Sequence, residues 1–257
     1  MTVLSGTWWL THRRLMALLR QLGVVIITLA QPAIWLFLFG SLFRRVVELP
    51  GFGAASYVDY IVPGVVIMNA VSSNMWAGMG TIEEIDRGTM DRFLVAPVRR
   101  SAIINANVIE QSVSTTLQSL LIVALGRLGG AHYPGGVVGV LVLVLASILV
   151  GVVFSALSNT MGLLVRQRET IIGMSIFLLL PLTFLSTAFM ASDLMPGWIR
   201  HAAAANPVNW ALEAGRTALG TDPDWPSVAM HGGYLLGLAV VAIGLSSLAL
   251  RRYQRTL

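Results

Sequence analysis

The chain has 257 residues, of which 56% are hydrophobic and 11% are charged, and its formal net charge is +5. Soluble domains carry about 25% charged residues, so the composition excludes a soluble globule and indicates an integral membrane protein. All 17 basic residues are Arg and there is no Lys or Cys, which excludes a P-loop ATPase, Schiff-base chemistry, disulfides and thiolate metal sites.

The first predicted element, over residues 1–21, is an interfacial helix. At the helical period, most apolar side chains of residues 8–22 fall on one half of the helix, and Arg13, Arg14 and Arg20 fall on the opposite arc. Such an amphipathic segment lies at the membrane surface. It is either a simple anchor or an elbow helix whose Arg side chains contact a cytoplasmic partner.

Six apolar stretches are long enough to cross a bilayer, which requires about 20 residues. They cover residues 22–43, 60–82, 101–126, 137–165, 170–192 and 228–250. The first is longer than the apolar core of a signal peptide, so we expect it to be retained. Pro32, Pro63 and Pro181 lie inside three of the stretches, where bundle packing tolerates kinks. The sequence therefore predicts an all-α, single-domain integral membrane protein with six transmembrane helices.

The distribution of Arg predicts how these spans are oriented. Most Arg residues fall in the N-terminal segment, the second and fourth loops and the C-terminal tail, and fewer fall in the other loops. Because loops rich in Arg stay on the cytoplasmic side, both termini are predicted to be cytoplasmic. The positive charge is thus a topology signal, and we expect no nucleic acid partner.

The second loop, residues 83–100, mixes carboxylates with Arg residues. Gly88 is expected to end the preceding helix, Thr89 to cap a short amphipathic helix, and Pro97 to stop it. The loop is either a solvated segment that only fixes topology or a docking surface. Its carboxylates and its bounded helix favour the docking surface. The candidate docking residues are Glu83, Glu84, Arg87, Gly88, Thr89, Asp91, Arg92, Phe93, Leu94, Pro97 and Arg100.

The external loop between the last two spans, residues 193–227, is unusually apolar. Asn206 is a good N-cap, Pro207 fits the first helical position and Gly220 fits the C′ position, which predicts a helix over 207–219. Residues 192–200 predict an earlier short helix. The segment either re-enters the outer leaflet as a gate or forms a folded cap with no gating role. The candidate gate residues are Met195, Trp198, Asn206, Pro207 and Trp210.

Polar and aromatic side chains inside the spans are candidates for a substrate path. They are Gln31, Trp35, Asn69, Asn74 and Phe184, although buried amides also hold helices together in membranes. Glu110 is the one acidic residue well inside a span, which makes it a functional candidate. Alternatively, Glu110 pairs with a cytoplasmic Arg such as Arg14 or Arg20.

Three local patterns resemble those of a known family. The first is Glu84, Gly88, Thr89, Asp91, Arg92, Leu94, Pro97, Val98 and Arg100 in the loop after the second span. The second is the stretch 180–198, which is similar to the end of the family's fifth span and its outer helix. The third is Asn206-Pro207 followed by Trp210 and Arg216. These patterns resemble the membrane subunits of type-2 ABC exporters, the ABC-2 permeases, especially the bacterial multidrug or daunorubicin-resistance type.

The resemblance implies a bacterial inner-membrane exporter subunit that is not itself an enzyme. Two permease subunits, identical or paralogous, would pair, and two copies of a separate ATP-binding subunit would bind ATP and Mg. This chain would bind no cofactor. Residues 88–97 would form the coupling helix, the elbow helix would be a second contact with the ATPase, and residues 194–219 would close the outer exit. Spans one, two and five would line the path and build much of the subunit interface.

The substrate implied by the resemblance is a lipophilic, drug-like small molecule, with a lipid or a glycan polymer as alternatives. A different class, the proton-coupled secondary carrier, would need Glu110 as its ionisable group. An intramembrane protease is disfavoured because no G-x-S-x-G motif frames any Ser.

Overall fold

The computed structural model describes residues 22–49, 56–88 and 100–254, and side chains are described for 30–49, 56–88 and 106–253. Every regular element in this part of the chain is helical, which confirms the predicted all-α class for these residues. The helices are α2 (Leu22–Leu42), η1 (Arg44–Glu48), α3 (Tyr57–Met75), α4 (Ala77–Asp86), α6 (Arg100–Leu128), α7 (Gly136–Val165), α8 (Arg168–Phe184), η2 (Ser192–Leu194), α9 (Gly197–Ala204), α10 (Pro207–Leu219) and α11 (Trp225–Gln254).

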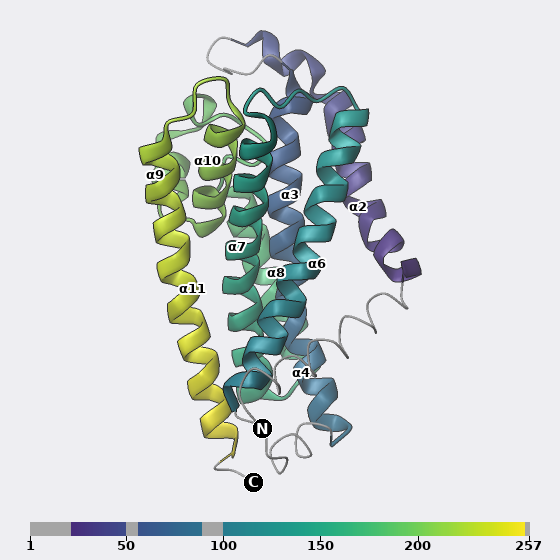
Figure 1. Cartoon of the computed structure of the whole chain (residues 1–257), viewed down its shortest axis with the longest axis vertical. Helices are drawn as coiled ribbons and strands as arrows, with labels where there is room; N and C mark the ends of the chain where they lie inside the picture. Colours follow the sequence, from purple (N-terminus) through teal and green to yellow (C-terminus); the bar gives the residue numbers. More distant parts are fainter. Residues whose placement is uncertain (1–21, 50–55, 89–99, 255–257) are drawn as a thin grey trace.

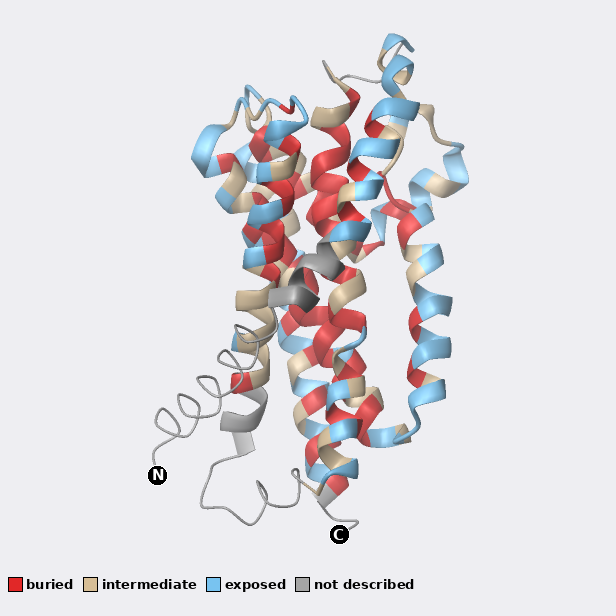
Figure 2. Cartoon of the chain, turned by 90° about the vertical axis from the view of Figure 1, so that its right-hand side faces the viewer, coloured by how far each residue is buried: buried red, intermediate tan, exposed pale blue. Residues whose placement is uncertain are grey.

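Helix α7 is the centre of the bundle. It contacts α3, α4, α6, α8, α10 and α11, and the buried residues concentrate in the interior of the bundle (Figure 2). Many of its buried positions are small, including Gly139, Gly151 and Gly162, so neighbouring helices can approach closely. By contrast, α2 packs on α3 and α6, and its first turns diverge from the bundle (Figure 1).

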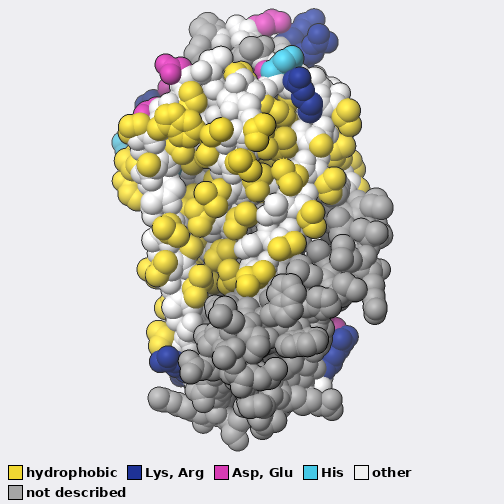
Figure 3. Space-filling view, viewed as in Figure 1, with side chains coloured by type: hydrophobic (Ala, Val, Ile, Leu, Met, Phe, Trp, Pro, Cys, Tyr) yellow, Lys and Arg dark blue, Asp and Glu magenta, His cyan; other side chains and the backbone are white. Residues whose placement is uncertain are grey.

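The surface of the described residues fits a bilayer. Figure 3 shows hydrophobic side chains over the middle of one face, with charged side chains near the two ends. Three helical stretches are long and apolar enough to span a membrane, namely Ala106–Leu128, Gly136–Val165 and Trp225–Tyr253. Residues Ala30–Leu42 form a shorter apolar stretch. The structure therefore supports a membrane bundle, while the count of six spans stays a prediction.

The second predicted span, residues 60–82, is divided into two helices. Helix α3 ends at Met75, and α4 begins at Ala77 after Trp76. The break is stabilised from α7, because Ser158 Oγ donates to the Met75 carbonyl at 2.5 Å and accepts from Gly78 N–H at 2.9 Å. A hydroxyl on a neighbouring helix thus replaces the backbone hydrogen bonds that the break removes.

The fifth predicted span, residues 170–192, ends earlier than expected. Helix α8 stops at Phe184, and residues 185–191 lead to η2 without forming a helix. The predicted helix over 207–219 is confirmed as α10, with Asn206 accepting from Val208 N–H and Pro207 at its first position. Gly220 follows α10 with φ −67, so the helix ends without a left-handed C′ residue. The expected short helix over 192–200 appears as η2 and α9.

Helix α7 makes backbone contacts near both of its ends. A Cβ on Gly135 or Gly139 would lie 2.1 or 2.4 Å from the Ala218 carbonyl of α10. At the other end, a Cβ on Gly162 would lie 2.7 Å from the Gly78 carbonyl of α4. Larger residues at these positions would separate the helices, so glycine is required for these contacts.

Candidate functional site

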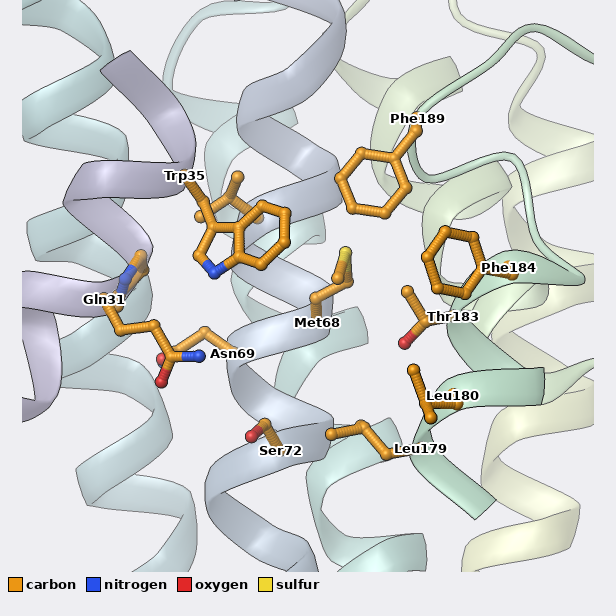
Figure 4. Close-up of a pocket in the computed structure, with 12 residues that line it drawn as sticks. Gln31, Trp35, Met68, Asn69, Ser72, Leu179, Leu180, Thr183, Phe184 and Phe189 are labelled. Atoms are coloured by element: carbon orange, nitrogen blue, oxygen red, sulfur yellow. The ribbon is translucent and has the colours of Figure 1, made fainter. Parts of the chain in front are cut away.

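The candidate site is a cavity of about 230 Å³ between α2, α3, α8 and the segment that follows α8. Its lining consists of Gln31, Pro32 and Trp35 from α2, Val65, Met68, Asn69 and Ser72 from α3, Leu179, Leu180, Thr183 and Phe184 from α8, and Phe189. Figure 4 shows Trp35 on one side and Phe184 and Phe189 on the other, with Met68 between them. The described lining is mostly apolar and carries no charged side chain.

Aromatic rings line both sides of this cavity. Trp35 stacks on Phe39 with ring centroids 4.7 Å apart and planes 1° apart, and its centroid lies 6.0 Å from that of Phe189. Phe189 in turn lies 5.4 Å from Phe39 and 6.2 Å from Phe184. Such rings offer large apolar contact area to a ligand with flat or aromatic parts. The stack with Phe39, which does not itself line the cavity, holds the Trp35 ring in place.

Amide and hydroxyl groups supply the polar part of the cavity. Asn69 donates from Nδ2 to Gln118 Oε1 of α6 at 2.7 Å, and Gln118 donates to Ser114 at 3.0 Å. The Asn69 amide is therefore held by α6 while it lines the cavity. A few oriented polar groups in a largely apolar cavity are typical of small-molecule sites.

Four of the six predicted path residues meet in this cavity: Gln31, Trp35, Asn69 and Phe184. Asn74 lies elsewhere, because its Nδ2 donates to the Ala70 carbonyl at 2.8 Å and to Thr115 Oγ1 of α6 at 3.0 Å. Asn74 is 1% exposed and packs against Gly151 of α7, so it joins helices. Glu110, on α6, is not among the lining residues of the cavity, and its role stays a prediction.

The predicted docking loop is described only where it begins and ends. Glu83, Glu84, Arg87 and Gly88 lie at the end of α4, and Arg100 begins α6. The structure confirms that Gly88 follows the end of a helix, with a left-handed φ of 64. Thr89, Asp91, Arg92, Phe93, Leu94 and Pro97 lie outside the described residues, as do Arg13, Arg14 and Arg20 of the predicted elbow helix.

Helix α4 is fixed firmly to the bundle just before this loop. A Cβ on Gly78 would lie 2.2 Å from the Ser158 carbonyl, and Thr81 Oγ1 donates to Asn159 Oδ1 of α7 at 2.7 Å. At its end, Asp86 pairs with Arg168 of α8 at 2.8 Å, and Glu83 pairs with Arg87. A displacement of α4 would therefore act directly on α7.

The predicted gate residues lie near the opposite end of the bundle, on or next to α9 and α10 (Figure 1). Trp198 is 68% exposed, whereas Asn206 is buried. Asn206 donates from Nδ2 to the carbonyls of Leu182 and Leu185, both at 2.7 Å, so it connects α10 with the end of α8. Trp210 donates to the Ala204 carbonyl at 2.7 Å, and its ring lies 5.4 Å from that of Tyr234.

Arg216 has a position that the sequence did not reveal. It was expected in an external loop, yet its guanidinium carbon lies 3.8 Å from the Tyr60 ring centroid, and Nη1 donates to Thr187 Oγ1 at 3.0 Å. Asn209 and Glu213 lie beside it on α10 and also contact Thr187. The spacing of Asn209, Glu213 and Arg216 places three polar residues on one helix face, which could have indicated this cluster.

Comparisons with known proteins agree with this architecture. Residues 5–219 match the ABC-2 type transporter family. The daunorubicin resistance ABC transporter permease protein DrrB1 of Streptomyces coeruleorubidus is 28% identical over 231 residues, covering 87% of this chain and 78% of the relative. The inner membrane transport permease YadH of Escherichia coli K12 is 25% identical over 221 residues, covering 83% of each. Because the family match extends over most of its length, the chain belongs to the ABC-2 type transporter family.

Proposed function

We propose that this chain is the permease subunit of an exporter that moves a lipophilic, drug-like small molecule out of the cytoplasm or the inner leaflet. The substrate would bind in the cavity between α2, α3 and α8. The observation that carries this proposal is the convergence of Trp35, Phe184 and the amides of Gln31 and Asn69 on one mostly apolar cavity. A relative whose name specifies daunorubicin resistance supports the substrate class.

The energy for transport would come from a separate subunit that binds ATP and Mg, because this chain has no Lys for a P-loop. Two such subunits and a second permease chain would complete the exporter, with both termini cytoplasmic. Exposed apolar residues on the helices that form the cavity, including Leu180 of α8 at 55% and Ile34 of α2 at 61%, offer a surface for the second permease. In this arrangement the two cavities would face a shared path.

Helix α4 supports a role for the loop after it in coupling. This helix ends at that loop and contacts α7 through Gly78 and Gly162. Movement of an ATPase bound to residues 88–97 would therefore shift α4 and α7 together. The cavity would change shape because α3, which contributes four of its lining residues, also packs on α7.

The proposal is tested by purifying the tagged chain from its native membrane in mild detergent and identifying its stable partners. We expect a P-loop protein to co-purify, and we expect ATP hydrolysis by the complex to respond to rhodamine 6G. A chain that purifies alone and without ATPase activity, from membranes that contain the ATPase, would contradict the proposal. That result would favour the secondary carrier and make Glu110→Gln the next variant.

The cavity itself is tested by Trp35→Ala. Removing the stacked indole should raise the rhodamine 6G concentration for half-maximal binding roughly ten-fold, because a central aromatic contact contributes strongly to binding. Trp225→Ala is the matched control, since Trp225 is 47% exposed on α11 and does not line the cavity. Equal binding by both variants would move the substrate site away from this cavity.

A further inference from the structure

The segment after α8, which we call the α8 turn (residues 185–189), is buried without being helical. Ser186 and Thr187 are each 3% exposed and Ala188 is 0% exposed. Non-helical backbone at membrane depth is tolerated only where other protein groups satisfy its hydrogen bonds. The partners of this backbone therefore identify what holds the turn in place.

Three successive carbonyls of the α8 turn each receive a hydrogen bond from a side chain of another helix. Tyr60 of α3 donates from its hydroxyl to the Thr187 carbonyl at 2.6 Å. Arg216 of α10 donates from Nη2 to the Ala188 carbonyl at 3.1 Å. Tyr57 of α3 donates to the Phe189 carbonyl at 3.2 Å. The turn is thus fixed by long-range contacts rather than by its own helix.

Arg216 is at the centre of these contacts. Its guanidinium stacks on the Tyr60 ring and donates to Thr187 Oγ1 at 3.0 Å and to the Tyr60 carbonyl at 3.3 Å. Glu213 lies close by, with Oε1 at 3.3 Å from Thr187 Oγ1. A planar group with several fixed donors can join α10, α3 and the turn at once, which a Lys ammonium cannot do in the same geometry.

The turn carries part of the candidate cavity. Phe184 directly precedes it and Phe189 ends it, and both line the cavity (Figure 4). The turn also presses on α3, since a Cβ on Gly64 would lie 2.7 Å from the Ala188 carbonyl. Any shift of the turn away from α3 would therefore move the two Phe rings.

We infer that Arg216 is a positioning residue that holds the Phe184 and Phe189 wall of the cavity through its hydrogen bonds to the Ala188 carbonyl and the Thr187 hydroxyl of the α8 turn. This inference rests on the proposed function of the cavity. Loss of Arg216 leaves the Ala188 carbonyl without the hydrogen bond that Arg216 donates. Because the guanidinium also stacks on the Tyr60 ring, its loss weakens the hold of Tyr60 on the Thr187 carbonyl. With Arg216 in place, a movement of α10 would reach the cavity through this side chain together with Asn206 and Asn209, which also bond to the end of α8 and to the turn.

Cysteine reactivity tests this inference without requiring transport or the ATPase. The chain contains no Cys, so Ser186→Cys places a single thiol in the turn, and Ser147→Cys places one in α7 at a site 0% exposed. The measurement is the rate of labelling by N-ethylmaleimide in native membranes. In Arg216→Gln we expect the thiol at 186 to react roughly ten-fold faster. The turn loses the hydrogen bonds from the buried guanidinium and therefore opens to the reagent more often. The thiol at 147 should stay protected.

Two further variants separate the loss of one positive charge from the loss of the planar guanidinium. Arg200→Gln removes one exposed positive charge from α9 and should leave both thiols protected. Arg216→Lys keeps the charge but loses the planar donors, and should give an intermediate rate at 186. The inference would be overturned if Arg216→Gln changed the labelling rate of the thiol at 186 by less than about two-fold. It would also be overturned if both thiols became equally reactive, and Arg216 would then be a general stability residue.

A second readout connects the turn with the cavity. Arg216→Gln should raise the rhodamine 6G concentration for half-maximal binding, because the Phe wall is no longer held. Faster labelling at 186 with unchanged binding, in a chain whose binding responds to Trp35→Ala, would refute the link between Arg216 and the cavity. If Trp35→Ala also left binding unchanged, the substrate site would be wrong, while the labelling result for the turn would stand.

Discussion

The two ends of α8 are held by contacts of different kinds. At its first residue, Arg168 pairs with Asp86 of α4, and the two side chains are 47% and 55% exposed. At its last turn, Asn206 binds the carbonyls of Leu182 and Leu185 in a buried setting. Exposed ion pairs contribute about 0–1 kcal/mol, whereas leaving a buried acceptor unsatisfied costs about 1–3 kcal/mol. The difference teaches that the polar contacts hold the cavity end of α8 more strongly than its α4 end.

The largest expected effect comes from Asn206→Ala. This change removes the N-cap of α10 and the donor for two carbonyls of α8, which should lower the free energy of unfolding by about 2–4 kcal/mol. The measurement is the thermal unfolding midpoint in detergent. Asn206→Ser keeps a neutral side-chain oxygen for the cap and lacks the Nδ2 donor, so it should fall between wild type and Asn206→Ala. A Ser variant as stable as wild type would show that the carbonyl contacts contribute nothing.

A smaller effect is expected for Gly64→Ala, which tests how tightly the α8 turn presses on α3. The added Cβ would meet the Ala188 carbonyl, and such overpacking costs about 1–3 kcal/mol. Gly80→Ala is the matched control, because nothing lies within 4 Å of a Cβ at that position. We expect the control to be neutral or slightly stabilising by thermal unfolding, as Ala favours a helix. If Gly64→Ala and Gly80→Ala were equally stable, the α8 turn would be able to move away from α3 at little cost.

The smallest expected effect belongs to Asp86→Asn at the other end of α8. Loss of an exposed pair should change the free energy of unfolding by less than about 1 kcal/mol, and the difference should vanish at high salt. In Arg168→Gln the same pair is already absent, so adding Asp86→Asn to it should have no further effect. A loss comparable to that of Asn206→Ala would remove the contrast between the two ends.

Local signals in the sequence predicted α10 well but missed the end of α8. Asn206 and Pro207 are adjacent and act on their own helix, so α10 could be predicted from a short window. Residues 185–191 contain no Gly or Pro, and the break there depends on Tyr60, Asn206 and Arg216, which are distant in sequence. The break at Trp76 likewise depends on Ser158 of α7.

The candidate site was partly predictable for a similar reason. Polar and aromatic side chains in an apolar span stand out locally, which identified Gln31, Trp35, Asn69 and Phe184. Their convergence depends on how three helices pack, which no single stretch contains. Asn74 has the same chemistry as Asn69 and also bonds to α6, but it packs against Gly151 of α7 and does not line the cavity. The docking residues between 89 and 97 lie outside the described residues, and their role remains the proposal made above.

The backbone contacts near both ends of α7 connect α4 to α10 through one continuous helix. Gly162 bears on Gly78 of α4, and Gly139 bears on Ala218 of α10. Because an α-helix rises about 1.5 Å per residue, these two contacts are about 35 Å apart along α7. A tilt of α7 by about 5° around one contact would displace the other contact by about 3 Å. No side chain of α7 separates the backbones at these two contacts, so a displacement of α4 would act on α10 through α7 with few intervening side chains.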